Sequence, residues 1–140
     1  MVKNLDPISH VMTANVLTVS IDQKLSTVRK MMAENQIHHI PVINDRKLAG
    51  LISATDMLKL NIASAEMNTK SIDELIDQQY TIAQVMQKNL VTINIRDSMR
   101  KSAHILSNGL FHSLPVIDDD RNLIGIITST DLIRYLAKSY

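Results

Sequence analysis

The strongest constraint on the fold is an internal duplication. Residues 8–21, ISHVMTANVLTVSI, align with residues 82–95, IAQVMQKNLVTINI, and residues 36–45, QIHHIPVIND, align with residues 110–119, LFHSLPVIDD. The offset is 74 residues, and it rises to 75 beyond Asp120, which lengthens one turn by a residue. Because equivalent residues favour equivalent elements, the duplication predicts two copies of one structural unit.

Each copy predicts the same order of elements. Asp6 before Pro7 is typical of a helix start, and Thr81 stands where it can cap the equivalent helix of the second copy. The expected elements are a helix over 5–12, an extended piece at 17–19 or 91–93, a helix over 24–35 whose counterpart ends near Asn108, hairpin strands over 40–43 and 48–52, and a helix over 54–60. The predicted fold class is therefore α/β (α+β), with two repeats of helix, strand, helix, hairpin and helix.

The repeats also predict the domain organisation. Residues 1–60 form the first copy, residues 82–140 form the second, and residues 61–81 form a polar linker with a helix from about Ser71. A repeat of about 53 residues is marginal as a free-standing core. We therefore expect the two copies to pack on one another about a pseudo-twofold axis.

Composition excludes several classes of protein. Apolar residues make up 45% and charged residues 21% of the 140-residue chain, which favours a globular fold. The 15 Lys and Arg residues against 14 Asp and Glu residues provide no strong field for nucleic acid. No apolar run approaches the length of a signal sequence or membrane span, and the absence of cysteine excludes disulfides and thiolate chemistry. We expect a cytoplasmic protein that binds neither nucleic acid nor membrane.

The phrases GLISATDML at 50–58 and GIITSTDLI at 125–133 place hydroxyl residues and an aspartate where a strand meets a helix. An ionised carboxylate only accepts hydrogen bonds, so it suits a vicinal diol, and a helix N-terminus suits phosphate. The alternative is structural, because Ser53 with Asp56 three residues later resembles a capping box. Both interpretations stay open for the sequence alone.

Metal binding and catalysis find little support in the pattern. His38 and His39 are neighbours on an expected strand, so their side chains point to opposite faces and cannot chelate one metal ion together. Gly50, Gly109 and Gly125 are too scattered for a P-loop or a dinucleotide fingerprint. No set of nucleophile, base and orienting group stands apart from the repeats. We expect no metal, no catalytic residues and no enzymatic activity.

The paired motifs resemble a tandem pair of CBS domains, also called a Bateman module. The resemblance rests on VM in each leading segment, a Thr in the first strand, a His-x-apolar-Pro-Val segment and the final Gly-apolar-apolar-Ser/Thr-x-x-Asp. It implies a regulatory homodimer that binds AMP, ADP, ATP or S-adenosylmethionine in clefts between the repeats, with no cofactor and with an unspecified partner protein. The alternatives are a structural or protein-interaction module without a ligand, or a regulatory subunit of an enzyme or transporter on another chain.

The resemblance also implies site residues. The two final aspartates would hold the ribose hydroxyls, the nearby hydroxyl residues would face ribose and phosphate, and the first-strand threonines with the backbone before each hairpin would frame the base from the opposite copy. The set is Thr18, Ile37, His38, His39, Ile40, Ser53, Thr55, Asp56, Thr92, Phe111, His112, Ser113, Leu114, Thr128, Thr130 and Asp131. Many CBS pairs carry a phosphate-binding arginine where this chain has His39 and Ser113, which favours ligands with little phosphate charge.

Overall fold

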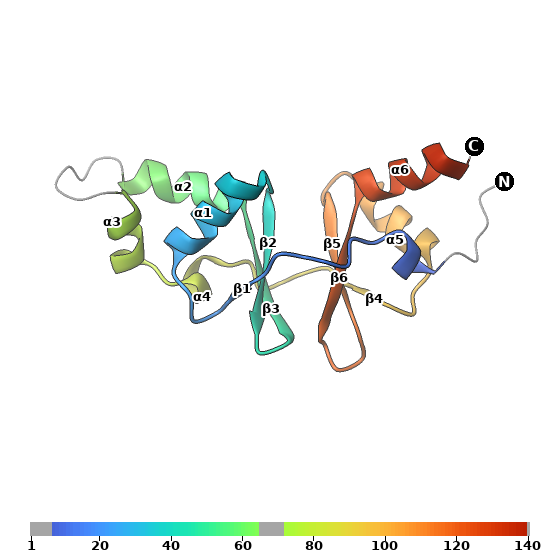
Figure 1. The fold of residues 1–140 in the computed structure, drawn as a ribbon, viewed down its shortest axis with the longest axis horizontal. Coiled ribbons are helices and arrows are strands. Elements are labelled where there is room, and N and C mark those ends of the chain that lie inside the picture. Colours follow the sequence, from blue (N-terminus) through green and yellow to red (C-terminus); the bar gives the residue numbers. More distant parts are fainter. Residues whose placement is uncertain (1–6, 65–71, 140) are drawn as a thin grey trace. The chain divides into compact units, whose positions relative to one another are not determined.

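A computed structural model describes residues 7–64 and 72–139. The chain divides into two compact units (Figure 1). The central unit is Leu17–Leu90, and the terminal unit combines Met1–Val16 with Val91–Tyr140. Each unit contains its own three-stranded sheet and its own apolar core.

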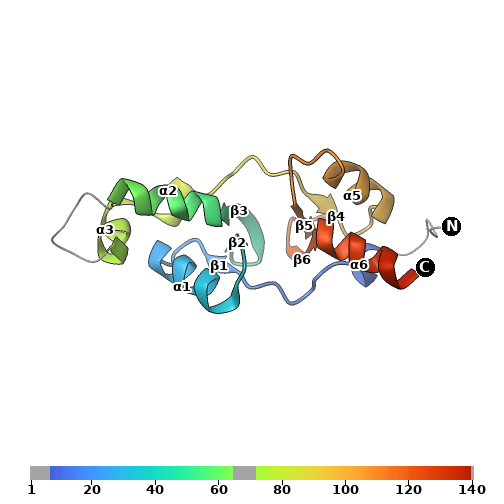
Figure 2. The same ribbon diagram turned by 90° about the horizontal axis from the view of Figure 1, so that it is seen from above.

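The central unit consists of a small sheet covered by helices. Its elements are β1 (Val19–Ser20), α1 (Leu25–Asn35), β2 (His39–Asn44), β3 (Lys47–Ser53), α2 (Ala54–Ser64), α3 (Ile72–Gln79) and α4 (Ile82–Val85). Strand β1 runs parallel to β2, and β2 pairs antiparallel with β3. Helix α3 contacts both α1 and α2 (Figure 2).

The terminal unit repeats this architecture, and its described residues, 7–16 and 91–139, contain no counterpart of α3. Its elements are the 3₁₀ helix η1 (Ile8–His10), β4 (Ile93–Asn94), α5 (Met99–Leu106), β5 (Ser113–Ile117), β6 (Leu123–Thr128) and α6 (Ser129–Ser139). Strand β4 runs parallel to β5, and β5 pairs antiparallel with β6. The register shifts after Val116, as it does after Val42 in the central sheet, so even the irregularities of the hairpin are repeated.

The predicted order of elements is confirmed, with differences at the boundaries. The two extended pieces begin two residues later than expected, at Val19 and Ile93, because these residues face the parallel partners in β2 and β5. Helix α2 continues to Ser64 instead of ending at residue 60. The first helix is a short 3₁₀ turn after Pro7 with no side-chain cap, and Asp6, its expected cap, lies outside the described residues.

The compact units exchange the leading segments of the two sequence repeats. Ile8 belongs to the buried core of the terminal unit, and Ile82 belongs to that of the central unit. Each crossing segment is fixed by a pair of backbone hydrogen bonds, between Thr13 and Ile126 at 2.8 and 3.0 Å, and between Gln87 and Leu51 at 2.8 and 3.1 Å. Each leading segment therefore completes the unit that holds the other repeat's hairpin.

The exchange explains why each copy of the repeated motif begins with a glycine, Gly50 or Gly125. A Cβ atom on Gly50 would lie 2.5 Å from Met86 Sδ and 2.9 Å from the carbonyl oxygen of Gln87. On Gly125 it would lie 2.8 Å from both Met12 Sδ and the carbonyl oxygen of Thr13. Only a residue without a Cβ atom admits the crossing backbone at this distance.

The segment between the repeats does more than connect them. The helix expected from about Ser71 is confirmed as α3, although Ser71 itself lies outside the described residues. Leu75 and Ile76 of α3 are buried, and Ile76 packs in the core of the central unit. Residues 72–79 are therefore a structural part of that unit.

Candidate functional site

The strand-to-helix junction of the central unit carries Ser53 at the end of β3 and Asp56 in the first turn of α2. The backbone N–H of Ser53 donates to Oδ2 of Asp56 at 2.9 Å, and the N–H of Asp56 donates to Oγ of Ser53 at 3.1 Å. These reciprocal bonds form the capping box that the sequence offered as the structural alternative. The Ser53 hydroxyl is thus engaged in holding the helix start.

The terminal unit builds the same junction from Thr128 and Asp131. The N–H of Thr128 donates to Oδ2 of Asp131 at 3.0 Å, and the N–H of Asp131 donates to Oγ1 of Thr128 at 3.0 Å. Both copies therefore hold an aspartate at a fixed place beside the N-terminus of an 11-residue helix. A carboxylate next to that partial positive charge remains an acceptor for a ligand that donates hydrogen bonds.

Each junction receives one more donor, from the crossing segment. Gln87 Nε2 donates to Asp56 Oδ2 at 3.3 Å. Thr13 Oγ1 lies 3.4 Å from Oδ1 and 3.5 Å from Oδ2 of Asp131. The sequence prediction missed Thr13 and Gln87; their alignment directly after the VM pair was the available signal, but it does not reveal that the segments cross.

The two carboxylates differ in burial and in charged neighbours. Only 8% of the Asp131 side chain is exposed, and Arg134 Nη1 lies 3.8 Å from its Oδ1. Asp56 is partly exposed, and Lys59, which aligns with Arg134, makes no ion pair with it within the described residues. The junctions are thus alike in backbone and unlike in side-chain surroundings.

Several of the other expected site residues lie next to the junction of their own unit. Thr55 and Thr130 are exposed in the first turns of α2 and α6, and Thr18 and Thr92 directly precede β1 and β4. The carbonyl oxygen of the residue before each hairpin accepts from the helix start: His38 from Ala54 N–H at 2.8 Å, and His112 from Ser129 N–H at 3.1 Å. The segments 37–40 and 111–114, with Ile37, Ile40, Phe111 and Leu114, therefore lie next to their own unit's junction.

The expectation that His38 and His39 both lie on a strand is wrong. His39 opens β2 opposite Ser53, whereas His38 precedes the strand and is exposed. In the second copy His112 is exposed and Ser113, opposite Thr128, is buried. Across residues 7–64 and 72–139, no three potential metal-binding side chains cluster.

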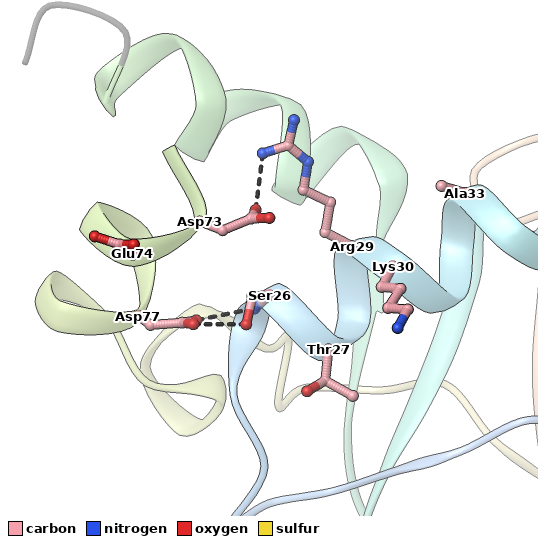
Figure 3. Close-up of a pocket in the computed structure, with 8 residues that line it drawn as sticks. All are labelled: Ser26, Thr27, Arg29, Lys30, Ala33, Asp73, Glu74 and Asp77. Carbon is pink, nitrogen blue, oxygen red and sulfur yellow. Dashed lines mark hydrogen bonds and ion pairs between the residues drawn. The ribbon is translucent and has the colours of Figure 1, made fainter. Parts of the chain in front are cut away.

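A concave region lies between α1 and α3, and none of the predicted site residues lines it (Figure 3). This open groove has a volume of about 580 Å³. Arg29 Nη1 pairs with Asp73 Oδ1 at 2.9 Å, and Asp77 accepts hydrogen bonds from Ser26. These side chains satisfy one another across the groove, which makes it a helix-packing contact rather than a second candidate site.

No helix in the described part of the chain combines the length and apolarity needed to cross a membrane.

Comparison with known proteins places this geometry in a family. The sequence model of the CBS domain matches residues 8–62 and 82–138. The MJ1225 protein of Methanocaldococcus jannaschii is 28% identical over 128 residues, which are 89% of this chain and 45% of that protein. Its crystal structure, that of a proposed archaeal homolog of g-AMPK, superimposes with a TM-score of 0.82 at 26% identity, covering 96% of this chain and 49% of the other.

Two further solved structures share the fold over nearly their whole length. CBSX2 in complex with AMP has a TM-score of 0.79 at 22% identity, covering 95% of this chain and 97% of that one. The CBS domain pair of protein MJ0100, in complex with 5-methylthioadenosine and S-adenosyl-L-methionine, has a TM-score of 0.72 at 23% identity, covering 96% and 98%. At these identities the likeness concerns the fold.

The curated relatives are mostly longer proteins. The chain spans 45% of MJ1225, and 24% and 23% of the homoserine O-acetyltransferases of Methanohalobium evestigatum and Methanosalsum zhilinae. What these proteins share with the chain is the duplicated module. With the family match over both repeats, two matching three-stranded sheets and the paired junctions, the chain belongs to the CBS domain family, as a tandem pair of CBS domains.

Proposed function

We propose that the chain is a regulatory sensor module that binds an adenosine-containing ligand at its two strand-to-helix junctions, without chemical turnover. The observation that carries the proposal is the paired placement of Asp56 and Asp131, each fixed by a capping box beside a helix N-terminus. The repeated junction supplies acceptors for a ribose diol and a favourable place for phosphate in the same turn.

The ligands of similar proteins support an adenosine core. AMP, 5-methylthioadenosine and S-adenosyl-L-methionine, bound by CBSX2 and the MJ0100 pair, share a nucleoside with a vicinal diol and differ in what replaces the 5′-hydroxyl. We therefore assign the diol to the aspartates and leave the choice among AMP, ADP, ATP and S-adenosylmethionine to experiment. The ligand would be a signal rather than a cofactor.

Two exposed hydroxyls are suited to the phosphate or 5′ end. Ser53 Oγ and Thr128 Oγ1 already accept backbone hydrogen bonds, whereas Thr55 and Thr130 are exposed in the first helical turn. A hydroxyl can donate to a phosphate oxygen there, beside the partial positive charge of the helix N-terminus. We propose that Thr18, Thr92 and the segments 37–40 and 111–114 frame the base.

A thermal-unfolding screen tests this function. Millimolar AMP, ADP, ATP and S-adenosylmethionine are added separately, with 2′-deoxyadenosine 5′-monophosphate as the control that lacks the diol. A ligand at a hundredfold excess over its Kd stabilises the folded state by about 2.7 kcal/mol. We expect a rise in Tm with at least one of the first four compounds and a much smaller one with the deoxy control; no rise with any of them would contradict the proposal.

A structural or interaction module is the second candidate, and the capping boxes favour it. Each aspartate has a complete structural role at its helix start without any ligand. In that case Asp56→Asn and Asp131→Asn would alter stability and leave nucleotide titrations unchanged. A module of either kind could act as the regulatory subunit of an enzyme or transporter on another chain.

We also propose a homodimer that joins through helical surfaces. Leu58 of α2 and Ile133 of α6 occupy equivalent positions, and they are 57% and 65% exposed. Large apolar side chains exposed at matched places on both helices are typical of interfaces. Light scattering at micromolar concentration is expected to give twice the chain mass of 15.7 kDa, and a monomer would contradict the dimer.

A further inference from the structure

We propose that the two junction carboxylates differ in their ability to accept hydrogen bonds from a ligand. Asp56 can accept from a ribose diol as it stands, whereas Asp131 can do so only after the hydroxyl of Thr13 has moved away. This inference rests on the proposed function. It concerns which of the two junctions binds the ligand first, and why. Thr13 is assigned as a positioning residue, because it acts on the ligand through Asp131.

The crossing segments place the two extra donors at matched positions. Thr13 is fixed through its N–H to the Ile126 oxygen at 2.8 Å and through its own oxygen to the Ile126 N–H at 3.0 Å. Gln87 makes the same pair of bonds with Leu51, at 2.8 and 3.1 Å. Because the backbones are equivalent, the difference between the junctions comes from the side chains.

Both carboxylate oxygens of Asp131 have donors of the protein close by. Oδ2 accepts the N–H of Thr128 at 3.0 Å, and the hydroxyl of Thr13 lies between the oxygens, 3.4 Å from Oδ1 and 3.5 Å from Oδ2. Arg134 Nη1 lies 3.8 Å from Oδ1. With 8% of the side chain exposed, little of this carboxylate is accessible to a ligand as it stands.

Asp56 concentrates its partners on a single oxygen. Oδ2 accepts both the N–H of Ser53 at 2.9 Å and the amide of Gln87 at 3.3 Å. Oδ1 accepts no hydrogen bond from any residue that the structure describes, and the side chain is partly exposed. A diol hydroxyl can therefore donate to Oδ1 without displacing a protein donor.

The difference in chemistry sets the order of binding. At Asp131 the ligand must replace the Thr13 hydroxyl, so the loss of that one protein hydrogen bond offsets one of the bonds that the diol gains. At Asp56 the first hydrogen bond from the ligand forms without the loss of a protein hydrogen bond. A net hydrogen bond changes affinity by about two- to tenfold, which is the expected difference between the sites from this cause.

Calorimetric titration with AMP tests the order, using Thr13→Val to remove the hydroxyl at constant shape and Thr13→Ser to retain it. We expect Asp56→Asn to remove the tighter binding event. Thr13→Val should tighten the event that Asp131→Asn removes by about two- to tenfold, and Thr13→Ser should leave it unchanged. A tighter or sole event that depends on Asp131, or no tightening in Thr13→Val, would overturn the inference.

Carboxylate labelling separates this inference from the proposed function, because it needs no ligand. The folded protein is treated with a carbodiimide and glycine ethyl ester, and the labelled peptides are quantified by mass spectrometry. We expect Asp56 to react faster than Asp131, and Thr13→Val, but not Thr13→Ser, to accelerate Asp131. Equal rates at the two aspartates would overturn the inference even if AMP binds, whereas the expected rates without AMP binding would overturn the proposed function alone.

Discussion

The two units start equivalent helices in different ways. Helix α5 follows Ser98, whose side chain accepts the N–H of Lys101 at 3.1 Å. Helix α1 follows Lys24, which offers no side-chain cap. There Asp77 of α3 accepts the N–H of Ser26 at 2.9 Å and its hydroxyl at 2.5 Å. One unit caps its helix locally, and the other depends on a helix inserted between the repeats.

The difference shows why the central unit needs α3. The first N–H groups of a helix require an acceptor, and a residue 51 positions away supplies it where the local residue cannot. The ion pair of Arg29 with Asp73 and the burial of Ile76 attach α3 to the same unit. The first repeat has Lys24 where the second has the capping residue Ser98, and Asp77, which lies outside the repeat, supplies the missing acceptor.

The largest expected effect on stability concerns a feature that both units share, the close contact of Gly50 and Gly125 with the backbone of a leading segment. Gly50→Ala puts a Cβ within 3.0 Å of Met86 and of the Gln87 carbonyl oxygen, so backbone must shift. We expect a loss of about 3 kcal/mol in the free energy of unfolding, and a similar loss for Gly125→Ala, whose added Cβ would lie 2.8 Å from the Thr13 carbonyl oxygen. Urea denaturation measures both.

Gly109→Ala is the matched control for the glycine variants. Gly109 has a φ of +73° and nothing within 4 Å of an added Cβ, so the substitution costs only backbone strain, about 1–2 kcal/mol. If Gly50→Ala proved no more destabilising than Gly109→Ala, the close crossing would be refuted.

The next effect separates the two helix starts. Asp77→Ala should lower the free energy of unfolding by about 2 kcal/mol, because it removes an acceptor from Ser26, whereas Ser98→Ala should cost about 1 kcal/mol. Lys24→Ser introduces a local cap, so it should recover about 1 kcal/mol in the Asp77→Ala background and little in the wild type. Equal effects of Lys24→Ser in both backgrounds would show that Asp77 does not cap α1.

The smallest effect concerns a surface pair of the terminal unit. The hydrogen bond from Arg96 lowers the pKa of Asp119 below its ordinary value of 3.8, with a further contribution from Asn94. Because the folded-state pKa is lowered, the pair stabilises the fold above about pH 4, and the contribution is lost as the pH falls below that value. In the central unit Asp22 and Asp45 occupy the positions of Arg96 and Asp119, so no such pair can form.

Thermal unfolding between pH 3 and pH 6 measures this contribution, with Asp119→Asn as the variant. On acidification the Tm of the wild type should fall slightly further than the Tm of the variant. The pair is exposed to solvent, so the difference should be small and should shrink further in high salt. An identical loss of Tm in both proteins would mean that the pair contributes nothing.

The sequence predicted the elements whose signals are local. The runs around Pro41 and Pro115 predicted both hairpins because they are apolar and β-branched, and the spacing of Ser53 and Asp56 offered, as the alternative to ligand binding, the capping box that the structure forms. Thr81 was predicted as a cap, and it forms a capping box with Gln84. Such features depend on residues within a few positions of one another.

Features that depend on distant residues were not predictable. Thr13 and Asp131 are 118 positions apart, and no periodicity shows that a leading segment completes the other repeat's unit. The cap from Asp77 was missed for the same reason, since a carboxylate on an amphipathic helix looks like an ordinary surface charge. The predicted ligand contacts of residues such as Thr18 and Thr92 stay predictions.

The most direct test of the account is calorimetric titration of AMP and of its 2′-deoxy analogue into the wild type, Asp56→Asn and Asp131→Asn. If the two carboxylates hold the ribose diol, each variant should lose about 1.5–3 kcal/mol of AMP binding at its own site, on the order of ten- to 150-fold in Kd. The deoxy analogue should bind weakly to the wild type and lose little more in the variants. Wild-type affinity for AMP in both variants would contradict the assignment of Asp56 and Asp131 to the ligand.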